Sequence, residues 1–246
     1  MNNLKDKVIL VTGSSRGIGA AIAQKLAEAG ARVIVNYAGG KTEADQTVSA
    51  IKAKGGEAIA LQADVSKAAE VKSMFDKAIE QYGRIDVLVN NAGIMITRLL
   101  KDIADEDFTR LFEINVRGTF NTMREAATRL ADKGSIINFS STVTRVIFPT
   151  YGIYNASKAA VEQLTRVFAK EVGGRGINVN SVSPGPTNTE LFTKGKSQEV
   201  MDHLASLSAF NRIGEPEDIA KIVVFLAGDE AKWISAQNIG INGGMA

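Results

Sequence analysis

Short apolar runs alternate along this chain with longer stretches in which apolar residues recur every three or four positions. The first run, Val8-Ile9-Leu10-Val11, is wholly apolar, which is typical of a parallel strand buried on both faces. The three-to-four spacing is typical of helices that cover such strands. The pattern predicts seven strands, at residues 8–11, 33–35, 58–61, 87–89, 134–140, 177–182 and 238–241.

Helices are predicted between these strands. Apolar spacing and end signals place them from about residue 18 to Gly30, at 42–54, from about 66 to 81, at 105–130, at about 154–172 and at 216–228. Asn115, followed by Gly118, interrupts the stretch 105–130. No linker, internal repeat or low-complexity segment divides the chain, so we expect one α/β domain over residues 1–246.

A glycine-rich turn, Thr12 to Gly19, joins the first strand to the first helix. A second strand follows that helix, which makes the segment a βαβ unit of the nucleotide-binding (Rossmann) kind. Glycines let the backbone approach a pyrophosphate, and a helix N-terminus directs free N–H groups at the anion. The spacing differs from G-x-G-x-x-G, and an ordinary tight turn is the alternative. We expect cofactor contacts from Gly13, Ser15, Arg16, Gly17, Ile18 and Gly19.

The same turn also spells G-x-S-x-G, from Gly13 to Gly17, which is the pattern of a hydrolase nucleophile elbow. That elbow needs a histidine base, and the sequence contains a single His, His203, in a polar stretch late in the chain. No oxyanion segment of the HGGG type occurs. The nucleotide-binding interpretation is therefore favoured over a hydrolase with Ser15 as its nucleophile.

The residues after the second strand bear on the choice of cofactor. Asn36 and Tyr37 stand where a carboxylate would bind the ribose 2′-hydroxyl of NAD and repel a 2′-phosphate. Because no Asp or Glu is present there, and because Arg16 lies in the glycine turn, the sequence favours NADP(H). A solvated turn residue is the alternative for Arg16.

Polar groups also follow the third and fourth strands at their carboxyl ends, where ligands of parallel sheets bind. Asp64, which precedes Val65, either accepts a hydrogen bond from the adenine amino group or, like Ser66, caps the next helix. The loop 90–93 either borders the same cleft or is a structural turn. For Asn115, a role in the site and a bond to the backbone are equally open.

The predicted catalytic residues are Ser141, which follows the fifth strand, and Tyr154 and Lys158, which lie on the next helix. Residues four apart share one helix face, and a nearby ammonium lowers the pKa of a phenol from its usual value of about 10. With Ser141 holding the substrate oxygen, Tyr154 would be a general acid for carbonyl reduction or a base for alcohol oxidation. The competing phenol, Tyr151, is followed four residues later by uncharged Asn155. An ordinary surface Tyr–Lys pair is the alternative.

The composition of the chain argues against several kinds of partner and functional site. The chain has 246 residues, 45% hydrophobic and 23% charged, with a net charge of +2 and no Cys. We therefore expect no nucleic-acid partner, disulfide framework, thiolate nucleophile or His-based metal site. No apolar run approaches the ~20 residues of a membrane span, and no signal peptide is evident, so the expected location is cytoplasmic. Residues 188–212, polar with scattered apolar positions, predict a mobile helical lid.

These motifs together resemble the short-chain dehydrogenase/reductase family over essentially the whole chain. The matching residues are Thr12-Gly13 with Gly17-Ile18-Gly19, Asp64, Asn90-Asn91-Ala92-Gly93, Asn115, Ser141, Tyr154 with Lys158, and Pro184-Gly185 with Thr189. Their order and intervals agree, including the thirteen positions from Ser141 to Tyr154. The resemblance implies a seven-stranded parallel sheet with helices on both faces. It also implies a homotetramer packed through the long fourth and fifth helices and the C-terminal segment.

The resemblance further implies a role for each motif. Tyr154 would be the general acid or base, Lys158 would bind the nicotinamide ribose and lower the pKa of the phenol, and Ser141 would orient the carbonyl. Asn115 would hold a water in the proton relay. Contacts to the cofactor are implied for Asp64, Val65, Asn91, Ala92, Gly93, Pro184, Gly185, Thr187 and Thr189.

The leading hypothesis is an NADPH-dependent carbonyl reductase of a ketone or aldehyde with an apolar side. A 3-oxoacyl-(acyl-carrier-protein or CoA) reductase is the runner-up, because residues 142–149 lack the Gly-Asn-x-Gly-Gln run of its dedicated members. A sugar or polyol dehydrogenase comes third, and a non-catalytic NADP-binding regulator is the alternative from another class. The expected apolar edges of the substrate pocket are Ile94, Met95, Val143, Ile147, Phe148, Leu191 and Phe192.

Overall fold

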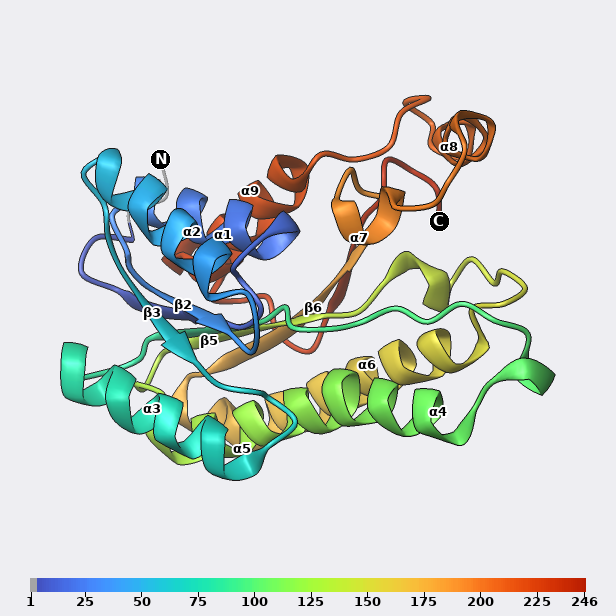
Figure 1. Ribbon diagram of the computed structural model, residues 1–246. Coiled ribbons are helices and arrows are strands. Elements are labelled where there is room, and N and C mark those ends of the chain that lie inside the picture. Colours follow the sequence, from blue (N-terminus) through green and yellow to red (C-terminus); the bar gives the residue numbers. More distant parts are fainter. Residues whose placement is uncertain (1–3) are drawn as a thin grey trace.

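One parallel sheet of seven strands runs through the computed structural model, which describes residues 4–246; residues 1–3 of the predicted domain lie outside the described part. The strand order is β3-β2-β1-β4-β5-β6-β7 (Figure 1). The strands are β1 (Val8–Val11), β2 (Arg32–Tyr37), β3 (Glu57–Gln62), β4 (Val87–Asn90), β5 (Ser135–Phe139), β6 (Asn178–Pro184) and β7 (Asn238–Ile241). All seven predicted strands are confirmed.

Helices cover both faces of the sheet. One face carries α1 (Gly17–Glu28), α2 (Lys41–Ala53) and α9 (Pro216–Ala227); the other carries α3 (Ala68–Tyr82), α4 (Asp105–Phe112), α5 (Gly118–Arg129) and α6 (Gly152–Val172). Short 3₁₀ turns lie at Leu100–Asp102, Thr142–Thr144, Gly173–Arg175 and Asp229–Ala231. The predicted α/β class with helices on both faces is confirmed. No helix within residues 4–246 is long and apolar enough to cross a membrane.

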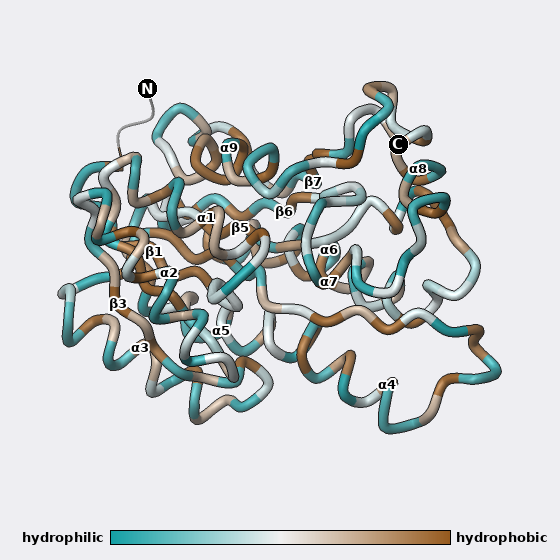
Figure 2. Tube along the Cα trace, turned by 45° about the horizontal axis from the view of Figure 1, so that its top comes forward, coloured by the Kyte–Doolittle hydropathy of each residue, from teal (hydrophilic) through white to brown (hydrophobic). Residues whose placement is uncertain are grey.

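The strands divide their side chains between two cores. Ile9 and Val11 of β1 face the cluster under α1, α2 and α9, whereas Val8 and Leu10 face the cluster under α3, α5 and α6. Successive side chains of a strand point to opposite faces, so a strand buried on both sides must be apolar throughout. Figure 2 shows the result as hydrophobic colour along β1 and on α9. This explains why β1 and most of β4 were visible in the sequence as apolar runs.

The stretch 105–130 departs from regular α-helix at its predicted interruption. A π-helical turn, Glu113–Arg117, separates α4 from α5 and contains buried Asn115. At Gly118, which follows the turn, a Cβ would lie 2.6 Å from Cγ2 of Val65. Asn115 bonds to the main chain of Ile94, in the loop that follows β4.

The strand order also indicates where a ligand-binding cleft lies. The chain winds from β1 to β2 and β3 on one side, then returns to β4, which pairs with β1 on the other side. Parallel sheets of this kind bind ligands outside the carboxyl ends of the strands at such a switch point. Two further helices, α7 (Glu190–Thr193) and α8 (Gln198–Ser206), lie beyond this edge beside the C-terminus (Figure 1). They occupy the segment predicted to be a lid; its motion stays a prediction.

Candidate active site

Two adjoining hollows follow the carboxyl edge of the sheet. The first, which we name the cleft, extends along the glycine turn and the ends of β2, β3 and β4. The second, which we name the substrate hollow, lies between the end of β5, α6 and the helices α7 and α8. Residues that line both are Ile18, Asn91, Gly93, Ile94, Thr189 and Leu191. The first hollow is long and borders the βαβ unit, and the second is lined largely by apolar side chains. A dinucleotide and a substrate would therefore meet at the shared residues.

The glycine turn leaves no room for a Cβ at two of its positions, Gly13 and Gly19. Gly13 and Gly17 both have φ of +59°, and a Cβ on Gly13 would lie 2.8 Å from Cα of Ala92. A Cβ on Gly19 would lie 2.5 Å from both Nδ2 of Asn91 and the main-chain oxygen of Gly13. The N-cap of α1, Arg16, makes no side-chain capping bond, so the free N–H groups of the first helical turn remain available to an anion. These features fit a pyrophosphate.

Asn36 was expected to contact the cofactor, but in the structure its side chain bonds to the main chain. Its Oδ1 accepts a hydrogen bond from the Gly13 N–H at 3.2 Å, and its Nδ2 donates to the main-chain oxygen of Ala63 at 3.0 Å. Asn36 lines the cleft, but its amide braces the glycine turn. Tyr37 is buried in the core under α1 and α2, and the structure does not bring it to the cleft. Sequence reasoning missed the small residues after them, Ala38 and Gly39, which do line it.

Arg16 stands at the open end of the cleft. Its guanidinium lies 3.7 Å from the carboxylate of Glu190 on α7, with the two side chains 70% and 66% exposed. Ser15 lines the same hollow, and its main-chain oxygen accepts a hydrogen bond from Thr47 at 2.9 Å. His203 lies on α8 and does not line this hollow. Ser15 therefore has no histidine beside it, which the hydrolase interpretation required.

Asp64 lines the cleft next to Val65 and Ser66. Its Oδ1 accepts hydrogen bonds from the Ser66 N–H at 3.0 Å and the Ser66 hydroxyl at 2.7 Å. The cap of α3 is Lys67, without a side-chain capping bond, so capping by Asp64 or Ser66 is wrong. Asp64 shapes the loop after β3, and its contact with an adenine stays a prediction.

The loop after β4 clamps the glycine turn. Asn91 Nδ2 donates to the main-chain oxygens of Thr12 and Gly13 at 3.0 and 2.9 Å, and the Ala92 N–H donates to the Thr12 hydroxyl at 3.0 Å. Beyond it, a Cβ on Gly93 would lie within 3.4 Å of Lys158 Nζ. The loop therefore both stabilises the glycine turn and borders the cleft.

The Asn115 side chain is fully engaged by hydrogen bonds. Its Oδ1 accepts from the Ile94 N–H at 2.8 Å, and its Nδ2 donates to the Ile94 oxygen at 2.9 Å and the Ser157 hydroxyl at 3.1 Å. Asn115 therefore ties the loop after β4 to α6, close to Lys158. The proton-relay role implied by the resemblance stays a prediction.

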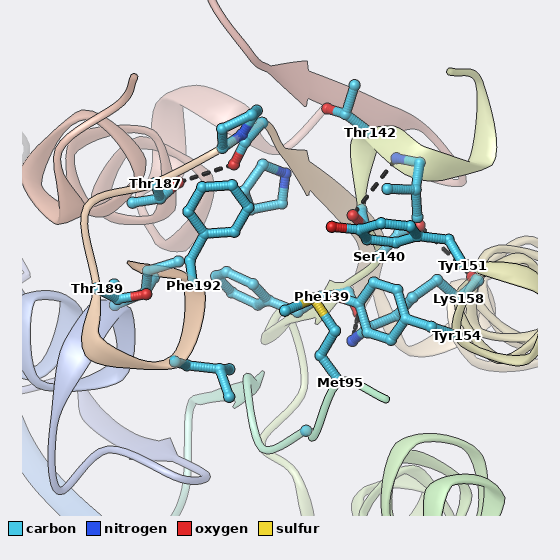
Figure 3. A pocket seen from close by; sticks show the side chains of 18 of the residues that line it. Met95, Phe139, Ser140, Thr142, Tyr151, Tyr154, Lys158, Thr187, Thr189 and Phe192 are labelled. Atoms are coloured by element: carbon cyan, nitrogen blue, oxygen red, sulfur yellow. Dashed lines mark hydrogen bonds between the residues drawn. The ribbon is translucent and has the colours of Figure 1, made fainter. Parts of the chain in front are cut away.

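Ser141, Tyr154 and Lys158 all line the substrate hollow (Figure 3). The Lys158 ammonium is buried, lies 5.8 Å from the centre of the Tyr154 ring and donates to the main-chain oxygen of Phe139 at 2.8 Å. The Ser141 hydroxyl accepts from the Val143 N–H at 3.4 Å. The three predicted groups are therefore brought to one cavity.

The electrostatics of this pair differ from the expectation. Burial raises the pKa of Tyr154 to about 12, and a hydrogen bond with the Ser141 hydroxyl opposes that rise only in part. Burial lowers the pKa of Lys158 to about 8. The expected lowering of the phenol pKa by Lys158 is thus reversed in this structure, because desolvation of both groups outweighs their attraction. Tyr154 is held as a neutral phenol at pH 7.

Apolar and aromatic side chains line the rest of the substrate hollow. Figure 3 shows Phe192 of α7 across the cavity from Tyr151 and Tyr154, with Met95 between the two sides. Of the predicted edges, Ile147 does not line the cavity and is 80% exposed. Residues of this cavity that the sequence did not indicate are Pro186 in the loop after β6, Leu204 of α8 and Met245 near the C-terminus. No local pattern marks them, because only the fold brings these segments over the site.

The predicted contacts after β6 divide between the two hollows. Pro184, Gly185 and Thr187 line the substrate hollow, and the Thr187 hydroxyl donates to the main-chain oxygen of Gly185 at 2.9 Å. Thr189 lines both hollows, and its Cγ2 would be 3.6 Å from a Cβ on Gly17. Thr189 therefore lies beside the glycine turn, and its contact with a phosphate stays a prediction.

Comparisons with known proteins agree with this geometry. The family model described as enoyl-(acyl carrier protein) reductase matches residues 13–246. A relative from Arabidopsis thaliana, named NADPH-dependent aldehyde reductase-like protein, chloroplastic, is 44% identical over 98% of this chain and 94% of its own length. This chain belongs to the short-chain dehydrogenase/reductase family.

Solved structures of the short-chain dehydrogenase/reductase family superpose closely on it. A member from Serratia marcescens BCRC 10948 has a TM-score of 0.94 at 39% identity and covers 99% of both chains. The angucycline C-6 ketoreductase LanV, solved with bound NADP, has a TM-score of 0.93 at 38% identity, covering 99% of this chain and 97% of that chain. The family and the fold implied by the sequence motifs are confirmed, and the chain is an oxidoreductase of this family.

Proposed function

We propose that this protein is an NADPH-dependent reductase of ketones or aldehydes that have an apolar, partly aromatic side. The observation that carries the proposal is that Ser141, Tyr154 and the buried Lys158 ammonium line one largely apolar cavity, which adjoins the nucleotide cleft. A protonated phenol enters the reaction as an acid, which suits reduction in the direction of the alcohol.

Three side chains, Tyr154, Ser141 and Lys158, have separate roles in the proposed reduction. When bound, NADPH supplies the hydride that adds to the carbonyl carbon. Tyr154 donates its proton to the carbonyl oxygen, and the Ser141 hydroxyl donates a hydrogen bond to the same oxygen as its negative charge grows. The Lys158 cation, 5.8 Å from the phenol ring, stabilises the phenolate left behind. A proton from solvent then restores the phenol.

Several features support NADP(H) as the cofactor. No acidic residue follows β2 in the 36–40 segment, and Ala38 and Gly39 leave that end of the cleft uncrowded by side chains. Arg16 supplies a cation at the mouth of the same hollow. The Arabidopsis relative is named NADPH-dependent, and LanV was solved with NADP. Gly13, Gly17 and Gly19 would admit the pyrophosphate, and Lys158 would meet the nicotinamide ribose.

The substrate class follows from the cavity and the relatives. Phe148 and Tyr151 are neighbours on the Tyr154 side of the cavity, and Phe192 lies across it, so the cavity offers aromatic surface on both sides. LanV is a ketoreductase of an angucycline. The second candidate is an acyl-thioester reductase, favoured by the description of the matching family model. A non-catalytic regulator would have no use for the assembled Ser–Tyr–Lys set.

A substrate panel tests these alternatives. The purified protein would be mixed with NADPH or NADH and an aromatic ketone, an aliphatic ketone, a 3-oxoacyl thioester or an enoyl thioester, and loss of the reduced-cofactor absorbance followed. We expect the highest kcat/KM with NADPH and the aromatic ketone. Faster reduction of a thioester would favour the second candidate, and cofactor binding without turnover on any substrate would favour the regulator.

Assembly and location stay proposals. We propose a homotetramer, because apolar side chains on α5 and α6 are exposed in the single chain, among them Phe120 and Val167. The cytoplasmic location expected from the sequence stays a prediction, since the Arabidopsis relative is named chloroplastic.

A further inference from the structure

A carboxylate on α6 lies beside the turn that follows β5. Glu162 stands four residues after Lys158 and eight after Tyr154, so the three share one face of the helix. Its Oε1 accepts a hydrogen bond from the Ser140 hydroxyl at 2.6 Å and another from the Thr144 hydroxyl at 2.7 Å. Both distances are in the short range of O–H groups that donate to a charged oxygen.

The two hydroxyls stand on either side of Ser141 in the sequence. Ser140 precedes it, and Thr144 ends the 3₁₀ turn of which Ser141 is the N-cap. Within that turn the Thr144 N–H donates to the Ser141 main-chain oxygen at 3.2 Å, and the Val143 N–H donates to Ser141 Oγ at 3.4 Å. One carboxylate oxygen thus holds both ends of the segment that orients the Ser141 hydroxyl.

Each hydroxyl has a single proton and a competing acceptor. Ser140 Oγ also lies 3.5 Å from the main-chain oxygen of Lys158, and Thr144 Oγ1 lies 3.0 Å from that of Ser141. The bonds to Glu162 are shorter and end on a charged oxygen, so the protons belong there. Within the described residues Glu162 forms no ion pair with Lys or Arg. Its contacts are with the turn.

We propose that Glu162 is a positioning residue for the reduction, which sets the turn carrying Ser141 at a fixed distance from the helix carrying Tyr154 and Lys158. Serine and tyrosine must converge on one substrate oxygen, although they come from different elements. A displacement of about 1 Å in such a site costs up to about 100-fold in rate. This inference rests on the proposed function, because it needs Ser141 to hold a substrate oxygen.

Two substitutions at one position separate geometry from charge. In Glu162→Gln the amide oxygen still accepts both hydroxyl protons, whereas Glu162→Ala removes the acceptor. We expect kcat to fall about 10- to 100-fold in the Ala variant and within about threefold in the Gln variant, with the Kd for NADPH unchanged in both. Glu171→Ala, an exposed position on the same helix, is the matched control and should keep wild-type kcat.

A second pair of variants keeps the test decisive if Glu162→Ala does not fold. Thr144→Val removes one donor, and Thr144→Ser keeps it; the first should lower kcat and the second should not. Unchanged kcat in folded Glu162→Ala or Thr144→Val, or equal losses in Glu162→Gln and Glu162→Ala, would overturn the inference alone. A wild-type protein that reduces no carbonyl would overturn the proposed function, and this inference with it.

Discussion

The Lys158 ammonium lies 5.8 Å from the centre of the Tyr154 ring, yet the pKa of the neutral phenol is raised and not lowered. Both groups are desolvated, so the pKa of the phenol rises to about 12 and that of the ammonium falls to about 8. The ammonium donates a hydrogen bond to the Phe139 main-chain oxygen, 2.8 Å away. In the proposed reduction, Tyr154 would therefore begin with its proton, and the Lys158 cation would stabilise the phenolate that remains.

This arrangement has a consequence for stability at alkaline pH. The pKa of Lys158 is lowered from 10.5 to about 8, so between these pH values the unfolded chain binds more protons than the folded one. The free energy of unfolding contributed by this group therefore rises as pH increases from about 8 toward 10.5. Urea unfolding across this range should show the rise in the wild type and its absence in Lys158→Met, with Lys170→Met, exposed on the same helix, as control.

The phenol has the opposite effect in a higher window. Because its pKa is raised from 10.0 to about 12, the folded state holds the proton more strongly, and the contribution to stability falls as pH rises from 10 to 12. Tyr154→Phe should show a smaller fall, because only the other phenols whose pKa is raised by burial, Tyr82 and Tyr151, would then contribute to it. An unfolding curve of the variant that still declines as steeply as that of the wild type would contradict the assignment.

Catalysis should depend on the same hydroxyl. Tyr154→Phe removes the proton donor but keeps the ring, so we expect kcat to fall at least about 100-fold with NADPH binding retained. Stopped-flow turnover and cofactor fluorescence titration measure the two quantities. Tyr82→Phe, the same change at the end of α3, is the control. Loss of turnover in Tyr151→Phe instead would mean that the competing phenol is the acid.

Cofactor preference should respond in opposite directions at two residues of the cleft mouth. Arg16→Ala removes the cation and is expected to weaken NADPH binding far more than NADH binding. Glu190→Gln removes the carboxylate that lies 3.7 Å from Arg16 and should strengthen NADPH binding by up to about fivefold, the scale of an exposed ion pair. Titration of each variant with both cofactors measures this. Equal losses for NADPH and NADH in Arg16→Ala would show that the guanidinium does not recognise the 2′-phosphate.

Assembly can be tested on the exposed faces of α5 and α6. Phe120 is 44% exposed and Val167 is 58% exposed, and burial of such side chains in a tetramer would remove them from water. Light scattering should give four times the 26.2 kDa chain mass, and Phe120→Asp should give a smaller species. Lys52→Asp, which also introduces an Asp but at an exposed position of α2 on the other face of the sheet, serves as control. A wild-type monomer would refute the tetramer.

The central strands were readable because β1 and β4 are buried on both faces and are apolar along most of their length. The neighbourhood of Tyr154 and Lys158 was readable because helical spacing alone puts the two residues on one face. Asn91 lies beside the cleft at the end of β4, as its position in the sequence predicted.

Other properties depend on contacts that no local pattern records. The direction of the Tyr154 pKa shift depends on burial of the phenol, which only the fold reveals. The hydrogen bond between Asn36 and the glycine turn depends on the register of β2 beside β1. Ile147 was expected in the pocket because it is apolar, but the turn after Thr144 leaves it exposed.

The π-helical turn at Glu113–Arg117 gives the rod formed by α4 and α5 one more residue than regular winding needs. Deleting a single residue there would let the backbone wind as an ordinary helix, and Leu111 and Met123, both core side chains, would keep their present relative direction. Deleting one residue from the regular part of α4 or α5 would instead rotate one of them by about 100° and force it toward water. Tolerance to deletion should therefore be higher within this turn than in the helices on either side of it.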